Sequence, residues 1–234
     1  MRAGLKGEHS LRACRTYRSI GAKHLSRATF SRPNTKTPCK VTGNLAVTTS
    51  SNTVYVYQNA QGSPTKYLPY NLSAANDAAY DGAGNLFVNG TYTNHHFALI
   101  ELPYGSITFQ NISFVSYGNI DASEPILWDG QYLDMGSETS VGRPVKSLLK
   151  RLQISGSSAT LIDTIPLGQR SRASLPQFWI QDSALIQPKN RLVSSVSRYR
   201  YPGGKRIGQV TLGGWYDIWG AVVSVAPSRS HVRN

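Results

Sequence analysis

A small set of acidic, amide and tryptophan side chains stands at or near the start of short apolar runs, where they could bind a ligand. Three of them, Asp77, Glu124 and Asp217, are carboxylates, and carboxylate oxygens are preferred ligands of a hard cation such as calcium. Acids and aromatic rings could instead hold a small polar molecule. Both chemistries require a fold that gathers groups far apart in the chain. We predict no catalytic residue and a ligand site made by Asn76, Asp77, Glu124, Gln177, Asp217, Trp128 and Trp179.

Other residues that often do chemistry have a structural explanation in this sequence. Asp81-Gly82 and Asp129-Gly130 are typical of tight turns, because Gly accepts a positive φ and Asp bonds to its local backbone. His95-His96 has no third ligand at metal-binding spacing, so we predict a solvated loop. No Gly-x-Ser-x-Gly, phosphate-loop or His-Glu-x-x-His motif occurs. We predict no cofactor, except that the three carboxylates would allow calcium.

Short sequence motifs, called words below, recur along the chain and predict an internal repeat. The segment Gly84–Val88 is matched upstream by Gly43–Val47 and more loosely downstream by Gly130–Leu133 and Ser183–Ile186. A run ending in an acid precedes three of these words, and a strand-like run followed by a glycine turn comes after each of them. A repeat of roughly 40 to 50 residues is typical of a propeller blade, which buries its faces only against neighbouring blades.

One unit, Asn76 to Phe114, divides into four short runs at its turn residues. We expect strands at Ala78–Tyr80, Leu86–Val88, Phe97–Leu102 and Ile107–Phe114, with Asn89-Gly90 as the turn after the second. Such runs predict an antiparallel meander of four strands. The predicted fold is therefore all-β, with about four such blades, and a β-sandwich is the alternative because it also has short, evenly spaced strands.

The two ends of the repeat region suggest how the array could close. Its first unit begins with a second strand, while Trp219–Val225 resembles a first strand with nothing after it. If that last strand paired into the first blade, it would cover two exposed sheet edges in a closed ring. An open fragment of a longer propeller explains the same pattern, and the sequence does not choose between the two.

Residues 1–40 differ in composition from the rest of the chain. They hold both cysteines, Cys14 and Cys39, and a single acid, Glu8. Their ten basic residues give this segment +9 (10 − 1) of the net charge of +13. Neither a secretory signal core nor a membrane-spanning run of apolar residues is present. We predict a basic, disordered leader at 1–40, propeller repeats at 41–227 and a tail at 228–234.

The leader has three possible explanations. Its Arg, Ser and scarce acids fit a transit peptide. A basic arm could also bind nucleic acid or an anionic surface by releasing counterions. The simplest explanation is an extension with no folded role.

Several of the repeated words resemble a known group of proteins. Gly84–Gly90, Glu101–Ser106, Trp128–Leu133, Phe178–Gln181 and Tyr201–Lys205 are similar to words in bacterial NHL-like or YVTN-like β-propellers. The resemblance covers roughly residues 38–226 and implies a propeller from an exported, largely uncharacterised group. Members are usually longer and have a signal peptide, so this chain resembles a truncated member. Related propellers include calcium-dependent lactonases, but their carboxylate pattern has no residue-by-residue match here.

Three classes of function are compatible with these patterns. The first is a non-catalytic binding or scaffold module for a protein, a glycan or a small molecule. The second is a metal-assisted, lactonase-like hydrolase that uses Asp77, Glu124 and Asp217. The third is an anionic-surface or nucleic-acid binder acting through residues 1–40. For the body itself the sequence argues against nucleic acid, because its basic cluster lacks stacking aromatics and is typical of a solvated hairpin; this cluster comprises Arg198, Arg200, Lys205 and Arg206.

Overall fold

The structure of the protein is a computed structural model that describes residues 25–30, 43–49, 51–70, 72–93, 96–116, 125–138, 145–170, 177–189 and 195–212. These residues form four sheets and one 3-10 turn, η1 (Gln58–Ala60). Sheet I contains β1 (Leu25–Phe30), β2 (Leu45–Thr49), β3 (Val54–Tyr57) and β4 (Thr65–Tyr67). Sheet II contains β5 (Leu72–Tyr80), β6 (Leu86–Tyr92), β7 (Phe97–Leu102) and β8 (Gln110–Asn111).

The remaining two sheets follow in chain order. Sheet III contains β10 (Ile126–Trp128), β11 (Leu133–Glu138), β12 (Val145–Ser155) and β13 (Ser158–Arg170), with β9 (Ser113–Ser116) added at its outer edge. Sheet IV contains β14 (Trp179–Gln181), β15 (Ala184–Lys189), β16 (Ser195–Arg200) and β17 (Arg206–Thr211). The described residues include no helix long and apolar enough to cross a membrane.

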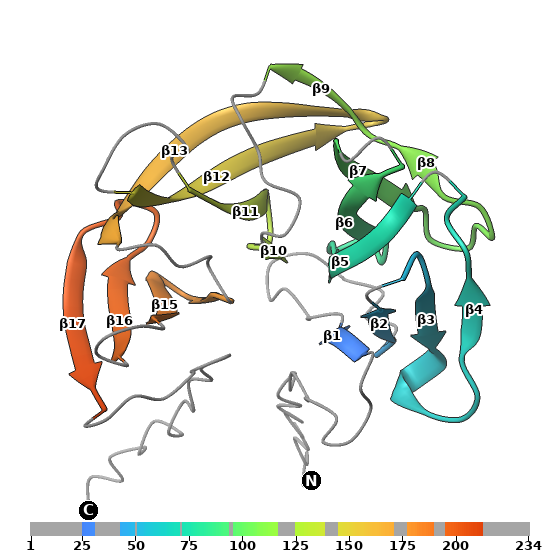
Figure 1. Ribbon diagram of the computed structural model, residues 1–234, viewed down its shortest axis with the longest axis horizontal. Coiled ribbons are helices and arrows are strands. Elements are labelled where there is room, and N and C mark those ends of the chain that lie inside the picture. The colour runs from blue at the N-terminus through green and yellow to red at the C-terminus, as the bar shows by residue number, and fades with distance from the viewer. Residues whose placement is uncertain are drawn as a thin grey trace, which may run out of the picture.

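The four sheets follow one another along an open arc, as Figure 1 shows. In each sheet the first strand lies toward the inside of the arc, and the last strand of each meander, β4, β8, β13 or β17, lies toward the outside. All neighbouring strands pair antiparallel except β9 and β13. The predicted all-β array of four meander sheets is confirmed as an open, partial propeller in the described residues.

The repeated leucines occupy matching places in the second strand of every sheet. Leu45, Leu86 and Leu133 each pair with the last residue of the preceding strand. Leu185 is displaced by one residue, because it pairs with Ile180 and the last residue of β14 faces Ala184. Despite that offset, Leu86, Leu133 and Leu185 all pack toward the preceding sheet. The repeated leucines therefore make equivalent contacts between neighbouring sheets.

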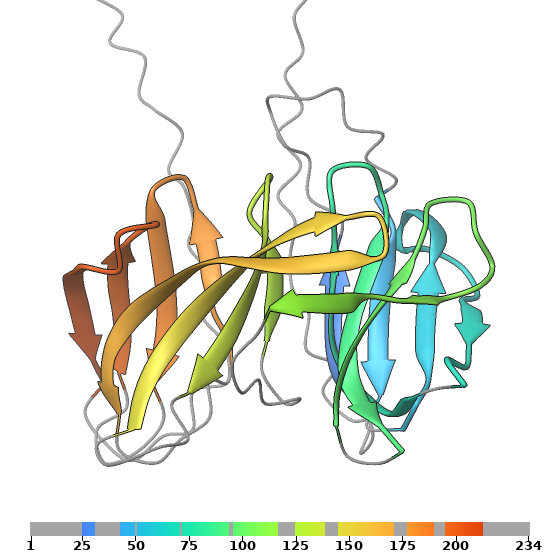
Figure 2. The same ribbon diagram turned by 90° about the horizontal axis from the view of Figure 1, so that it is seen from above.

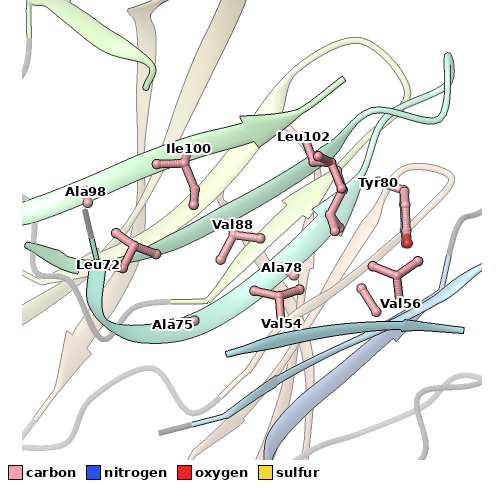
Figure 3. Packing of buried hydrophobic residues seen from close by; sticks show 12 residues of the cluster. Val54, Val56, Leu72, Ala75, Ala78, Tyr80, Val88, Ala98, Ile100 and Leu102 are labelled. Carbon is pink, nitrogen blue, oxygen red and sulfur yellow. The ribbon is translucent and has the colours of Figure 1, made fainter. Parts of the chain in front are cut away.

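Each pair of consecutive sheets is joined by an apolar cluster. Between sheets I and II, Val54 and Val56 pack against side chains from β5, β6 and β7, as Figure 3 shows. Phe87 and Leu133 lie in the second cluster, between sheets II and III, and Leu149 and Leu185 lie in the third, between sheets III and IV. Burying apolar surface contributes roughly 25 cal/mol per Å², so the contacts between sheets supply much of the driving force for folding.

The limits predicted for two strands are wrong. Strand β6 continues through Asn89 and Gly90 to Tyr92, so these residues do not form a turn. Asn89 is fully buried and its Oδ1 accepts a bond from the backbone of β5, which gives a polar residue a place inside a strand. A sequence typical of a turn, such as Asn89-Gly90, therefore does not end a strand when the Asn side chain has a buried hydrogen-bond partner.

The single strand predicted at Ile107–Phe114 is divided between two sheets. Ile107 is 85% exposed and lies in the turn before β8, whereas Ile112 is buried between sheets II and III. Beyond it, β9 crosses to sheet III and pairs in parallel with β13. Figure 2 shows the long β12–β13 hairpin reaching toward sheet II, where its tip meets β9. The chain changes sheets here because burial of Ile112 turns it inward.

The segment predicted to be a disordered leader contributes a strand. β1, from Leu25 to Phe30, pairs antiparallel with β2 and occupies the first-strand position of sheet I. Disorder is therefore wrong for this part of residues 1–40. In one of the two arrangements that the sequence analysis left open, Trp219–Val225 would take that position. This segment lies outside the described residues, as do Cys14, Cys39 and the predicted tail at 228–234.

Candidate functional site

The predicted ligand set is only partly described. Glu124 and Asp217 lie outside the described residues, so the convergence of the three carboxylates stays a prediction. The other five residues come from sheets II, III and IV: Asn76 and Asp77 on β5, Trp128 at the end of β10, Gln177 just before β14, and Trp179 at its start. Within the described ranges no three His, Cys, Asp or Glu side chains form a group that could hold a metal.

Asp77 and Asn76 join sheets together. The Asp77 side chain is buried, and its Oδ2 accepts the backbone N–H of Ile126 on β10 at 3.0 Å. Its own N–H donates to Asn89 Oδ1 at 2.8 Å. The carbonyl of Asn76 accepts the hydroxyl of Thr48 on β2 at 3.2 Å. These contacts tie sheet II to both of its neighbours, which is a structural use of residues that the sequence analysis assigned to a ligand.

Trp128 has a packing role. Its ring stacks on Phe87 of sheet II, with centroids 6.2 Å apart and an interplanar angle of 13°. This pair extends the apolar cluster between sheets II and III, where such contacts stabilise a fold by about 0.5–1.5 kcal/mol beyond the area that they bury. Gln177 and Trp179 are half-buried.

The most concentrated group of ionisable side chains lies at the junction of sheets III and IV. We call it the junction cluster and define it as Asp129, Asp134, Arg151 and Tyr201. Asp134 on β11 stands directly opposite Arg151 on β12, so both side chains lie on one face of sheet III. Asp129 follows β10 on the same sheet, and Tyr201 follows β16 on sheet IV. The cluster thus depends on the packing of two sheets.

The contacts within the junction cluster are short. Tyr201 Oη lies 2.5 Å from Asp129 Oδ2 and 2.6 Å from Asp134 Oδ2. Arg151 Nη2 donates to Asp129 Oδ2 at 2.9 Å, and its Nε lies 3.5 Å from Asp134 Oδ1. The guanidinium also lies 4.5 Å from the ring centroid of Tyr132 and 5.1 Å from that of Tyr201. A cation near two aromatic rings adds attraction to the ion pairs.

Counting hydrogens places a proton on one carboxyl of the cluster. A phenol has one hydrogen, so Tyr201 donates to only one of the two oxygens beside it. The second short contact requires a hydrogen from a carboxylic acid. Asp134 is the better holder, because its side chain is fully buried whereas Asp129 has four donors around it. Asp134 then donates to Tyr201, and Tyr201 donates to Asp129.

The pKa shifts agree with that arrangement. Burial raises the pKa of Asp134 to about 8; the charge of Asp129 adds to the rise, and the charge of Arg151 opposes it. Burial also tends to raise the pKa of Asp129, but bonds from Tyr201, Tyr132, Gln131 and Arg151 outweigh it and hold that pKa below its ordinary value. Burial raises the pKa of the Tyr201 phenol well above normal, and the neighbouring Asp129 carboxylate raises it further. At neutral pH the cluster therefore contains one acid, one carboxylate and one guanidinium.

Paired carboxylates at different pKa values are a chemistry that enzymes use, but here both carboxyl groups contact Tyr201 and Arg151. The side chain of Asp134 is 0% exposed and that of Asp129 is 7% exposed, so neither is presented to solvent. Their partners are groups of the same chain. The cluster acts as a polar joint between sheets III and IV.

Sequence analysis predicted one of the two structural roles of Asp129. Its Oδ1 accepts the N–H groups of Gln131 and Tyr132 at 2.7 and 2.6 Å, which confirms the predicted turn. The other oxygen, Oδ2, belongs to the junction cluster, which the sequence analysis missed. The sequence feature that could have predicted the cluster is Asp134, an acid between Leu133 and Met135 in a buried strand, because a buried charge needs a partner.

The outer side of the arc shows a different chemistry. Large apolar side chains are exposed on β9, β13 and β17, or beside β4, β8 and β17. Figure 1 shows these strands along the outside of the arc. We call this set the outer rim: Leu68, Tyr70, Tyr104, Ile107, Val115, Ile162, Ile207, Val210 and Leu212.

No protein-family model and no curated protein matches the sequence. Among solved structures, one described as the structure of the Dos1 propeller is similar at 12% sequence identity with a TM-score of 0.47. The match covers 80% of this chain and 47% of that one, so this chain spans about half the length of that structure. The fold described above is defined by the strand order and pairing of this chain itself.

Proposed function

We propose that the protein is a non-catalytic binding or scaffold module that holds its partner on the outer rim. The observation that carries this proposal is the exposure of the rim side chains, which ranges from 40% for Leu212 to 85% for Ile107. Extensive exposed apolar surface often marks an interaction site, and the rim side chains lie on or beside the outer strands of all four sheets. A protein, a glycan or a small molecule would supply the covering surface. Membership of the NHL-like or YVTN-like group is part of the same proposal.

The acidic side chains between the sheets also favour a binding module over an enzyme, because they are already engaged in structural contacts. Asp77 on β5 is bonded to the backbone of Ile126, and both acids of the junction cluster are bonded to Tyr201. Side chains that already join sheets are poor candidates for turnover, because each reaction cycle would have to break a structural contact. The rim side chains, in contrast, lose no contact when a partner covers them.

Array binding with the full chain tests the proposal. We expect glycan or peptide ligands whose binding is weakened at least about tenfold by the double variant Ile107→Ser, Val115→Ser, since hot-spot residues contribute about 1–2 kcal/mol or more each. The matched control is Thr108→Ala, an exposed polar position next to Ile107. Both variants should unfold at the wild-type urea concentration, because exposed substitutions change stability by only about 0.5 kcal/mol.

Two results would contradict the proposal. One is array binding that the rim variant leaves unchanged. The other is calcium-dependent hydrolysis of lactone or ester substrates by the wild-type chain, which would favour the lactonase-like alternative. Binding that is lost on removal of residues 1–24, which leaves β1 in place, and that depends steeply on salt would point to the basic leader.

A further inference from the structure

Strand β17 is the outermost strand of sheet IV. All six of its residues are exposed, and in the described residues it pairs with β16 alone. Alternate residues of an edge strand direct their N–H and C=O groups away from the sheet. Strand β17 therefore presents backbone donors and acceptors that another extended chain can pair with.

The side chains around this edge are strongly basic. The described stretches of sheet IV contain five basic residues and one acid, Asp182. Of the five, Arg198, Arg200, Lys205 and Arg206 are exposed beside the edge. None of these four pairs with a carboxylate in the described part of the chain, and only Arg206 has a side-chain bond, from Nη1 to Gln209 Oε1 at 2.9 Å.

The same edge also carries exposed apolar side chains. Val210 is 63% exposed and stands opposite Val196 of β16, while Ile207 is 45% exposed. Gly208 lies opposite Arg198, where its missing side chain leaves the Arg198 stem uncovered on that face. A strand laid along β17 would place its alternate side chains beside Val210 and the Arg198 guanidinium.

We propose that β17 is a docking edge for an extended acidic segment of another protein, which adds to sheet IV as a fifth strand. This inference rests on the proposed function and names the partner of one part of the rim. Main-chain hydrogen bonds would hold the added strand, apolar residues of that strand would cover Val210 and Ile207, and its carboxylates would pair with the four cations.

The charges favour this occupant over two others. A second copy of the chain, paired edge to edge through β17, would bring four cations against four cations, and like charges across a strand pair are destabilising. Nucleic acid would satisfy the charges, but single strands are bound by stacking bases on exposed aromatic rings. The exposed large side chains of this edge are aliphatic, and Tyr199 and Tyr201 are engaged in sheet contacts.

Binding of designed peptides to the full chain tests the proposal. The probe is a fluorescent six-residue peptide, the length of β17, with the sequence Glu-Glu-Val-Val-Glu-Glu, so that each face of the added strand carries both Glu and Val. Its counterpart replaces each Glu by Lys. Two further versions carry N-methyl groups on the odd or on the even residues, because a strand that adds to an edge uses the N–H groups of only one alternate set. Fluorescence anisotropy measures affinity at low and high salt.

We expect the acidic peptide to bind, the basic one not to bind, and only one N-methylated version to lose binding. The double variant Arg198→Glu, Arg206→Glu should weaken binding by at least about tenfold, and added salt should weaken wild-type binding. The matched control is Lys66→Glu, a basic exposed residue on β4, the outer strand of sheet I. It should leave the affinity unchanged.

Several outcomes would overturn the proposal. Equal binding of acidic and basic peptides removes the role of charge, and equal behaviour of both N-methylated peptides removes the added strand. Light scattering that shows wild-type dimers, together with no binding of the acidic peptide, would identify a second copy of the chain as the occupant. Tighter binding of a single-stranded oligonucleotide than of the acidic peptide would identify nucleic acid. Array ligands that depend on Ile107 and Val115 would still support the proposed function in each case.

Discussion

At the scale of single residues, Tyr201 connects two sheets through one hydroxyl group. Its oxygen touches carboxylates 72 and 67 residues away in sequence. A phenol in that position satisfies groups that would otherwise be buried without a partner. Leaving a buried polar group unsatisfied costs about 1–3 kcal/mol.

Replacing Tyr201 by Phe should therefore lower the free energy of unfolding by about 1–3 kcal/mol, because the ring stays and only the hydroxyl is lost. Urea denaturation followed by circular dichroism measures the change. The control is Tyr104→Phe, since Tyr104 is 53% exposed and should tolerate the loss of its hydroxyl. Equal midpoints for the wild type and Tyr201→Phe would show that the hydroxyl makes no such bonds.

Asp134 should make stability depend on pH. Its pKa is 3.8 in ordinary surroundings and about 8 in the fold, where Asp129, Arg151 and Tyr201 surround it. Between those values the folded protein holds more protons than the unfolded chain, so the free energy of unfolding falls as pH rises from about 4 to about 8. The contribution of Asp129 has the opposite sign and is lost only below its ordinary pKa, outside this window.

The variant Asp134→Asn isolates this effect, because an amide does not titrate. We expect urea midpoints of the wild type to decline relative to those of Asp134→Asn across pH 4 to 8. Other titrating groups, including Glu101, contribute equally to both proteins. Parallel midpoint curves would mean that Asp134 titrates in the fold as it does in the unfolded chain.

The roles of single side chains were harder to predict from the sequence than the fold was. Asp77 was expected to bind a ligand because acids at strand starts can converge, but it binds the N–H of Ile126 in the next sheet. Local sequence encodes the turn made by one oxygen of Asp129, whereas the bond of the other to Tyr201 exists only after two sheets pack. The side chain alone does not reveal its distant partner.

At the scale of elements, the tightest constraint is the close approach of β5 to β6. A Cβ atom at Gly90, in the middle of β6, would lie 2.0 Å from the backbone carbonyl oxygen of Ala74 on β5. The two strands are irregularly paired on both sides of this point. Glycine is therefore required here for space.

Gly90→Ala should destabilise the protein by at least about 1–3 kcal/mol, since overpacking against backbone cannot be relieved by a side-chain rotation. Thermal or urea unfolding measures the loss. Gly203→Ala is the matched control, because no atom lies within 4 Å of a Cβ at that position and its φ is not positive. If the two variants unfold alike, the approach of β5 to β6 is looser than described.

The positions of strands were easier to predict than their ends. Repeated words and apolar alternation located the second and third strands of every sheet. The ends depended on tertiary burial: Asn89 stays within β6 because it is buried, and the chain leaves sheet II after Asn111 because Ile112 is drawn into the cluster with sheet III. Turn residues report local preference, which such contacts override.

At the scale of the whole molecule, the repeat determines how the sheets are arranged. Each sheet presents one face to its predecessor, and the three apolar clusters lie between consecutive sheets. That order could be predicted, because similar sequence motifs in each repeat predict similar contacts between neighbouring sheets. The contribution of β1 could not, since Leu25–Phe30 matches none of the repeated words and pairs with β2 across a long connection.

The most direct test of this arrangement is a double-mutant cycle across two sheets, made with Tyr201→Phe and Asp134→Asn and measured by urea unfolding at pH 6. The account predicts that the two losses are not additive, with a coupling energy of about 0.5–3 kcal/mol, because Tyr201 and Asp134 touch across the junction of sheets III and IV. A control cycle pairs Tyr201→Phe with Asp81→Asn, a turn residue of sheet II, and should be additive within about 0.5 kcal/mol. Additivity in both cycles would contradict the packing of one sheet against the next.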